Sequence, residues 1–179
     1  MQPQDSSRLS YALMTADDIQ LMFDLDQDPE VMRYINGGTP STMTSLREVM
    51  IPRMQSYSNE NKGWGLWKVT VKQDQQFIGW VLVRPMDFFS DTPAWQDIEL
   101  GWRFKQSSWG KGYATEAASA IKDALIAKGD IEYLSAIVIE GNAASINIME
   151  KLGMSYIKTD VHKDPLGDME VVFYQLAVK

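Results

Sequence analysis

The chain has 179 residues, of which 45% are hydrophobic and 11% aromatic, enough for the core of one ordinary domain. It has no cysteine and one histidine, His162, which excludes disulfides, thiolate metal sites and a cysteine nucleophile and argues against a histidine metal site or a Ser-His-Asp triad. The net charge of -7 without a basic run argues against nucleic-acid binding. No stretch approaches the roughly 20 apolar residues of a membrane span. Because the chain also starts without the basic and apolar regions of a signal peptide, we expect one cytoplasmic domain over residues 1–179.

The N-terminal third predicts a short strand followed by helices. Residues 8–13 are typical of a strand, and Thr15, with an aspartate three residues on, predicts the N-cap of a first helix. A second helix is expected to begin at Asp28-Pro29 and to end at the Asn-Gly-Gly that follows. A third is expected over 41–58, where apolar residues share one face, with a kink at Pro52.

The middle of the chain changes to the alternating period of strands. Residues 65–71 and 76–84 flank a polar turn and predict an antiparallel hairpin. We expect residues 85–96, with two prolines and two adjacent phenylalanines, to be a loop that forms a mobile wall. Residues 97–104 alternate apolar with polar or small residues, which predicts a strand with one polar side that carries Glu99.

The C-terminal part predicts a helix between strands. Apolar residues line one face of a helix that ends at Lys128-Gly129, and residues 133–139 are apolar on both faces, as in a central strand. Asn142 is expected to cap a short helix, and strands are expected near 154–161 and 169–177. The fold class is therefore α/β with a mixed sheet, and the order strand, helix, buried strand favours a parallel crossover.

Two glycines, Gly110 and Gly112, stand between a predicted strand and the helix that begins near Tyr113. Glycine lets the backbone approach a ligand closely, and the first N–H groups of a helix form an anion site suited to a diphosphate. The spacing matches neither G-x-G-x-x-G nor the Walker A pattern. These residues alone leave a purely structural turn and a phosphate-binding turn equally open.

This turn and several other motifs, in the same order along the chain, together resemble a known family. The chain resembles the GNAT N-acetyltransferase superfamily, and most closely its RimJ/RimL-type branch, named for ribosomal-protein N-terminal acetyltransferases. The motifs are Ile98-Glu99-Leu100-Gly101-Trp102, the segment from Ser108 to Ala117, Asn142 to Ser145, Glu150-Lys151-Leu152-Gly153-Met154, and Asp28 to Ile35. The resemblance covers nearly the whole chain. It implies a sheet of about seven strands flanked by about four helices, with acetyl-CoA as co-substrate and no metal.

The resemblance also implies where acetyl-CoA binds. The family's acyl-CoA turn, Q/R-x-x-G-x-G/A, falls on Trp109 to Ala114, where Trp109 replaces the polar first residue. The pantetheine arm is expected to run beside Trp102 to Phe104, with Asn142 and Ser145 meeting it from the next helix. The expected cofactor-binding residues are Trp102, Phe104, Trp109, Gly110, Lys111, Gly112, Tyr113, Ala114, Thr115, Asn142 and Ser145. Lys111 or Lys151 is a candidate for reaching a phosphate.

Acetyl transfer to an amine requires the neutral amine. An alkylamine with a pKa near 10.4 is neutral in roughly one molecule in two thousand at pH 7, and an α-amine in roughly one in ten. A base therefore matters, and Glu99 is the best candidate, because its strand is expected beside the thioester. An ordinary solvated strand residue is the equal alternative, and Asp97 and Glu140 are poorer candidates for the base.

Many family members use a tyrosine on the helix after the fifth strand to protonate the departing thiolate. Counting from Asn142, that position is Met149, which carries no proton. Water, Ser145 or Tyr156 remain as donors, and a thiol with a pKa near 8.5 can also leave as thiolate. The alternative function is a non-catalytic acyl-CoA-binding sensor.

The acceptor stays open between a protein or peptide N-terminus and a small amine. We expect it to bind near 28–58 and 85–96, where Phe88 and Phe89 lie, because recognition usually varies in irregular segments on a rigid sheet. His162 is expected in a surface loop, and an exposed final strand could join two copies into a homodimer. Core packing is the default for Trp64, Trp67 and Trp95, which could instead line the acceptor pocket, and an acidic entrance for a cationic amine could come from Asp24, Asp26, Asp28 and Glu30.

Overall fold

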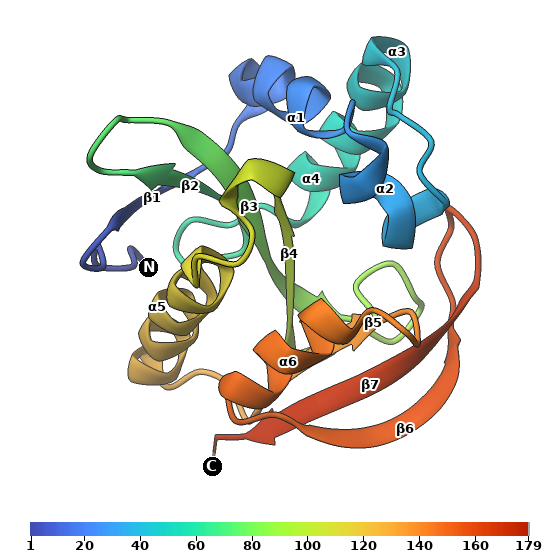
Figure 1. Ribbon diagram of the computed structural model, residues 1–179. Coiled ribbons are helices and arrows are strands. Elements are labelled where there is room, and N and C mark those ends of the chain that lie inside the picture. The colour runs from blue at the N-terminus through green and yellow to red at the C-terminus, as the bar shows by residue number, and fades with distance from the viewer. Residues whose placement is uncertain (179) are drawn as a thin grey trace.

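The computed structural model describes residues 1–178, and its centre is a mixed sheet of seven strands (Figure 1). The strands are β1 (Leu9–Leu13), β2 (Gly65–Val71), β3 (Phe77–Met86), β4 (Ala94–Phe104), β5 (Tyr133–Val138), β6 (Ser155–His162) and β7 (Met169–Ala177). Their order is β1-β2-β3-β4-β5-β7-β6, and every neighbouring pair is antiparallel except β4 and β5. The predicted α/β class and seven-stranded mixed sheet are confirmed.

The described residues form five α-helices of seven or more residues and one of three residues. They are α1 (Ile19–Leu25), α2 (Pro29–Asn36), α3 (Met43–Ser45), α4 (Ile51–Tyr57), α5 (Tyr113–Lys128) and α6 (Ala143–Lys151). The family resemblance implies about four helices rather than five, and the sequence predicts one kinked helix over 41–58. A π-helical turn over Leu46–Met50 instead separates α3 from α4. Pro52, at the start of α4, cannot donate the backbone hydrogen bond that would continue a regular helix.

Local sequence signals set the boundaries of these helices. Thr15 and Asp18 form the predicted capping box. Asp28 accepts a hydrogen bond from the backbone N–H of Glu30 at the start of α2. The helix ends at Gly37, which has a φ of 80° in the left-handed region, and α5 ends in the same way at Gly129. Short-range chemistry therefore predicts the start of α2 and the ends of α2 and α5, but not the division between α3 and α4.

The sheet buries both of its faces, and α5 lies against one of them (Figure 1). Side chains alternate along each strand, so Trp67 packs in the core with α5 while its neighbour Leu66 packs in a second core with α1, α2 and α4. On β3, Val81 faces the first core and Leu82 packs against the second. The early helices therefore cover the face opposite α5.

The same alternation of side chains determines which face of the sheet Glu99 of β4 lies on. Ile98 and Leu100 are buried in the α5 core, which places Glu99 on the face covered by the early helices. Glu99 is 5% exposed, so it is not the solvated strand residue of the alternative interpretation. The strand therefore has a polar side, as predicted, but that side is covered by protein instead of solvent.

The predicted loop 85–96 is shorter than expected. β3 continues to Met86 and β4 already begins at Ala94, so only residues 87–93 connect them. Pro85 lies within β3 opposite Ile98, immediately before a register shift. A proline lacks the N–H of a regular ladder position, and an irregularity beside it lets the strand continue.

Candidate active site

The site is built around an opening between β4 and β5. These strands pair in parallel at three positions, of which the last joins Glu99 to Ser135. β4 continues to Phe104 and β5 to Val138, so the two strands are no longer paired with each other beyond Glu99 and Ser135. On the side away from β3, backbone groups of β4 in this stretch face the opening rather than a neighbouring strand, which is a geometry that an extended ligand arm can use as an added strand.

The turn that follows β4 leads into α5. Gly110 and Gly112 have φ values of 72° and 77°, in the left-handed region that glycine adopts without strain, and Gly112 is the N-cap of α5. The Trp109 indole N–H donates to the Phe104 carbonyl at 2.9 Å, which ties the turn to the end of β4. The first N–H groups of the 16-residue α5 therefore face the ligand space with the positive end of the helix dipole.

A brace from the N-terminus holds this turn in place. The Arg8 guanidinium donates to the Lys111 carbonyl at 2.9 Å and to the Glu116 carboxylate at 2.7 Å, and it lies 4.4 Å from the centre of the Tyr113 ring. The Ser6 hydroxyl also donates to Glu116 at 2.6 Å. Burial raises the pKa of Glu116, but these hydrogen bonds outweigh it and hold the pKa below its usual value. Arg8 was not predicted, because its partners lie more than 100 residues away in sequence.

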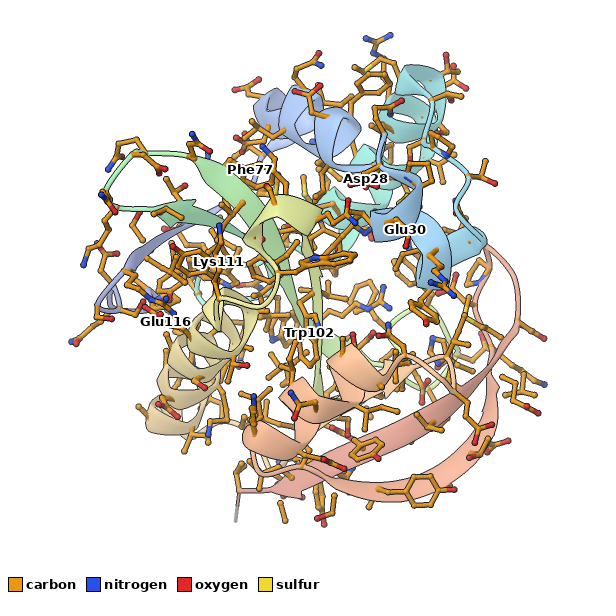
Figure 2. The ribbon with its side chains drawn as sticks, viewed as in Figure 1. Asp28, Glu30, Phe77, Trp102, Lys111 and Glu116 are labelled. Atoms are coloured by element: carbon orange, nitrogen blue, oxygen red, sulfur yellow. The ribbon has the colours of Figure 1, made fainter. Side chains whose placement is uncertain are left out.

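A hollow of about 400 Å³, here called the turn pocket, lies against this turn. Its walls come from the end of β4, the turn, α6 and α2. Figure 2 shows Trp102 between α5 and α6, with Glu30 on α2 beyond it. Ten of the eleven expected cofactor residues line it: Trp102, Phe104, Trp109, Gly110, Gly112, Tyr113, Ala114, Thr115, Asn142 and Ser145.

Two details of the turn pocket differ from the expectations drawn from the sequence. Lys111 is exposed and does not line it, whereas Lys151 does. The wall formed by α2, with Tyr34 and Ile35, was not predicted. The only local signal for that wall is the apolar face of the helix after Asp28, and the sequence could not show what this face covers.

A second hollow of about 510 Å³, here called the central pocket, adjoins the turn pocket. It lies between β3, β4, α4 and the β6–β7 connection. The two pockets share six lining residues, which are Tyr34, Ile35, Trp102, Arg103, Asn142 and Ser145. A ligand in one pocket can therefore reach a ligand in the other across β4.

Glu99 lines the central pocket as half of a buried ion pair. The Arg84 Nε–H donates to Glu99 Oε2 at 2.7 Å, and the two side chains are 11% and 6% exposed. Burial alone would lower the pKa of Arg84, but the carboxylate beside it raises the pKa, so the guanidinium stays charged. Tyr57 lies nearby, and burial raises its pKa to about 12. Its hydroxyl stays protonated at neutral pH.

The other candidates for proton transfer lie in different places. Asp97 lines neither pocket; its carboxylate accepts from Ser135 at 3.0 Å and Gln175 at 2.9 Å, and burial raises its pKa. Glu140 is exposed and lines neither pocket. Tyr156 is 53% exposed on β6 and also lies outside both. Among these candidates only Glu99 faces the central pocket.

An apolar side chain, Met149, occupies the position where many family members have a tyrosine. Met149 is 1% exposed and lines the central pocket. Ser145, one turn earlier in α6, lines both pockets, and its hydroxyl oxygen accepts from the Trp102 indole N–H at 3.3 Å. Asn142 caps the helix as predicted, by accepting from the Ser145 N–H at 3.2 Å.

The residues considered for the acceptor side lie in different places. His162 is not in the surface loop expected for it: it ends β6, is 9% exposed and lines the central pocket, with Nδ1 3.5 Å from Asp87 Oδ1. Trp67 is fully buried in the core, as its default interpretation predicts. Trp64 and Trp95 stack on each other with centres 6.0 Å apart and line neither pocket.

Asp26 is not part of a solvated acidic face. It is 3% exposed and accepts from Arg103 Nη1 at 2.6 Å. Glu30 lines the turn pocket rather than the acceptor side. The expected acidic entrance is therefore not formed, because the alternation of acids along α1 and α2 does not keep them on one surface.

Clustered metal ligands and membrane-spanning helices are both absent from the part of the chain that the structure describes. Residues 1–178 contain no group of three or more His, Asp or Glu side chains placed to hold a metal ion. None of the helices in the same range has the length and apolar character that crossing a lipid bilayer requires.

With this geometry in place, comparison with known proteins gives the family. The Acetyltransferase (GNAT) domain matches residues 8–155, so the chain belongs to the GNAT acetyltransferase family. The protein YkkB of Bacillus subtilis, whose activity is uncharacterised, is 34% identical over 138 residues, which cover 75% of this chain and 74% of YkkB. The protein is an acyltransferase, and acetyl-CoA is its co-substrate.

Solved structures show the same fold. A GNAT acetyltransferase from Bacillus anthracis superimposes with a TM-score of 0.74 at 21% identity over 99% of both chains. The ribosomal L7/L12 α-N-acetyltransferase RimL, solved with coenzyme A, gives 0.76 at 10% identity over 99% of this chain and 98% of RimL. A spermidine N-acetyltransferase from Vibrio cholerae, solved with coenzyme A and spermine, gives 0.71 at 14% identity over 96% of each chain.

Proposed function

We propose that this acetyltransferase moves the acetyl group of acetyl-CoA directly onto a primary amine while both substrates are bound. The observation that carries the proposal is that the turn pocket and the central pocket adjoin at β4. One pocket ends at the N-terminus of α5, and the other contains the buried carboxylate of Glu99. The absence of cysteine from the chain also removes the usual nucleophile for an acetylated enzyme intermediate.

Acetyl-CoA occupies the turn pocket in this proposal. Its diphosphate accepts hydrogen bonds from the N–H groups at the start of α5, held by the turn from Gly110 to Thr115. The pantetheine arm lies along β4 in the opening beyond Glu99, beside Trp102 and Phe104. The proposal gives Lys151, rather than Lys111, the phosphate contact, because Lys151 lines this pocket.

Glu99 acts as the base that receives the proton of the acceptor ammonium, directly or through water. The Arg84 bond occupies Oε2 and fixes the side chain, and Oε1 takes the proton. The neutral amine then attacks the thioester carbonyl, the C–N bond forms, and the C–S bond breaks. The nitrogen gives up its second proton as the amide forms, and this proton reaches the departing thiolate through Ser145 or water, so CoA leaves as the thiol. A base contributes most to the rate when the acceptor is an alkylamine, because an alkylamine is mostly protonated at pH 7.

Ser145 is the side chain that assists the leaving thiolate. The Trp102 N–H uses a lone pair of the Ser145 oxygen and leaves the hydroxyl proton to point at sulfur. No strong acid is required, because a thiol with a pKa near 8.5 is a good leaving group. Met149 in place of the family tyrosine is therefore compatible with turnover.

The wider identity of the protein is proposed on the same basis. The motifs from Asp28 to Ile35 and from Ser108 to Ala117 support the RimJ/RimL-type branch, while the likeness to RimL at 10% identity speaks for the fold alone. The sheet spans residues 9–177, which supports a single domain. The final strand, β7, lies between β5 and β6, so the expected pairing of two copies through it is wrong. The edge strand is β6, most of whose residues are exposed, and this supports a homodimer, which light scattering on the purified protein would test.

The test is two-substrate kinetics, in which acetyl-CoA and an amine are both varied and the release of the CoA thiol is measured. Direct transfer gives reciprocal plots that intersect, because both substrates must be bound before chemistry. Parallel plots would show an acetyl-enzyme intermediate and contradict the proposal. A protein that binds CoA but releases no thiol with any amine would contradict it as well.

A further inference from the structure

The wall of the central pocket is unusually rich in methionine. Six of the eleven methionines in the chain line it, namely Met22, Met32, Met50, Met54, Met149 and Met169. They come from five separate parts of the fold: α1, α2, the π-helical turn with α4, α6 and β7. Methionine is flexible and polarisable, so such a wall adapts to apolar bodies of different shapes and offers them no hydrogen bonds.

The charged residues of the same pocket cancel one another. Every carboxylate that lines it is paired with an arginine that also lines it, and the three pairs are Glu99–Arg84 at 2.7 Å, Asp26–Arg103 at 2.6 Å and Asp164–Arg53 in direct contact. The remaining titratable side chains are Tyr34, Tyr57 and His162. Asp87 stands behind His162, half exposed and outside the lining.

This balance has a consequence for the acceptor. A polyamine or aminosugar carries several ammonium groups, and each needs a carboxylate to replace the water that it loses on entry. The lining holds no carboxylate that lacks an arginine, and only the ammonium that reacts is relieved of its charge, at Glu99. A second ammonium in the pocket would stay charged among paired groups and methionine.

We propose that the acceptor is a small primary amine with a single positive charge on an apolar alkyl or aryl body. This inference rests on the proposed function, and it narrows the substrate class within it. A hollow of about 510 Å³ is large enough for such a molecule. The apolar body contacts the methionine wall, and the amine points toward Glu99 and the opening to the turn pocket.

A series of amines tests this directly. Butylamine, hexylamine and octylamine differ only in apolar length, and kcat/KM should rise by about fourfold for each added methylene that the pocket covers. Spermidine and kanamycin should be poorer than hexylamine by at least tenfold, and so should a tetrapeptide with an N-terminal leucine. A preference for spermidine or kanamycin would overturn the inference, and a preference for the peptide would overturn the small-molecule assignment.

A binding measurement separates this inference from the proposed function. Calorimetric titration of the CoA-loaded protein with octylamine and with spermidine needs no turnover. Tighter binding of octylamine supports the inference even if the chemistry were different, and tighter binding of spermidine contradicts it. Failure of the proposed function shows itself separately, as CoA binding without acetylation of any amine.

A matched pair of variants supplies the second test. Met50 is half-buried at the end of the π-helical turn, so Met50→Glu adds one carboxylate without an arginine, and Met50→Gln changes the side chain to a neutral one of similar length. Both should lower kcat/KM for hexylamine. Only Met50→Glu should raise kcat/KM for spermidine, on the order of tenfold relative to Met50→Gln. Equal values for spermidine in both variants would show that charge balance does not select the acceptor.

Discussion

The central pocket holds two buried acid–arginine pairs that are almost identical as structural elements, and this allows a sharp test of Glu99. The Glu99–Arg84 pair has an N–O distance of 2.7 Å and side chains 6% and 11% exposed. The Asp26–Arg103 pair has 2.6 Å and side chains 4% and 11% exposed. Glu99→Gln and Asp26→Asn each remove one charge and keep an amide oxygen for the arginine. Asp26 also accepts a hydrogen bond from the Ser41 hydroxyl at 2.7 Å, so any difference in fold stability should disfavour Asp26→Asn, and a larger loss of turnover in Glu99→Gln reports on chemistry.

The structural cost should be alike in both variants. Breaking a buried pair costs about 3–5 kcal/mol, and the retained amide oxygen favours the lower end. At about 2–4 °C per kcal/mol for a chain of this size, a loss near 3 kcal/mol lowers Tm by about 6–12 °C. For catalysis the cost should differ, because a positioned base contributes about 10²–10⁴-fold. We expect that loss in kcat for Glu99→Gln and less than tenfold for Asp26→Asn.

The assay is thiol release at saturating acetyl-CoA, measured from pH 6 to 9 alongside thermal melts. Without its base, the Glu99→Gln enzyme depends on the fraction of amine already neutral, so its rate should rise by about tenfold per pH unit below the pKa of the amine. CoA affinity should change little in either variant. Equal losses of kcat in both, or a Glu99→Gln rate unchanged over this pH range, would show that Glu99 only supports the fold.

Three further outcomes follow from the cofactor and acceptor sides. Gly112→Asp should abolish the stabilisation by CoA, worth about 2.7 kcal/mol at 100 times Kd, whereas Gly129→Asp, with the same left-handed backbone at the other end of α5, should keep it in thermal melts. The pKa of Glu116 is lowered in the folded state, so its contribution to stability is present above its usual pKa and is lost as the pH falls. The Tm difference between wild type and Glu116→Gln should therefore be smaller below about pH 4 than at pH 6. Replacing Phe88 and Phe89 by Ala should raise the KM of the amine several-fold and leave CoA affinity intact, because both rings pack edge-on against the pocket-lining tyrosine of α4; an unchanged KM with weakened CoA binding would reverse this division.

Much of the fold follows from signals that act within a few residues. Thr15 caps the first helix, Asp28 starts the second and Gly129 ends α5, each through contacts with near neighbours. The alternation in 97–104 correctly places Glu99 and its polar neighbours on one side of a strand. The turn residues from Gly110 to Thr115, apart from Lys111, also come together at the turn pocket as expected, because they are adjacent in the chain.

What could not be predicted depends on packing between distant segments. Alternation shows that Glu99 and Ile98 face opposite sides but not that helices cover both sides, so the partnership with Arg84 was missed. His162 becomes buried because residues 87–93 and the end of β6 meet, and no local pattern records that meeting. Arg8 braces the turn from more than 100 residues away.

Strand β4 contributes residues to both pockets: Phe104 lines the turn pocket, Glu99 lines the central pocket, and Trp102 lines both. Because side chains alternate between the faces of a strand, a shift of β4 by one residue would turn Glu99 into the α5 core and bring Ile98 to the face of the central pocket. The buried Glu99–Arg84 pair joins β4 to β3 on the pocket side and is satisfied only in the observed register, in which the two residues are direct partners. The residue proposed to take the proton therefore also specifies the alignment that places it in the central pocket.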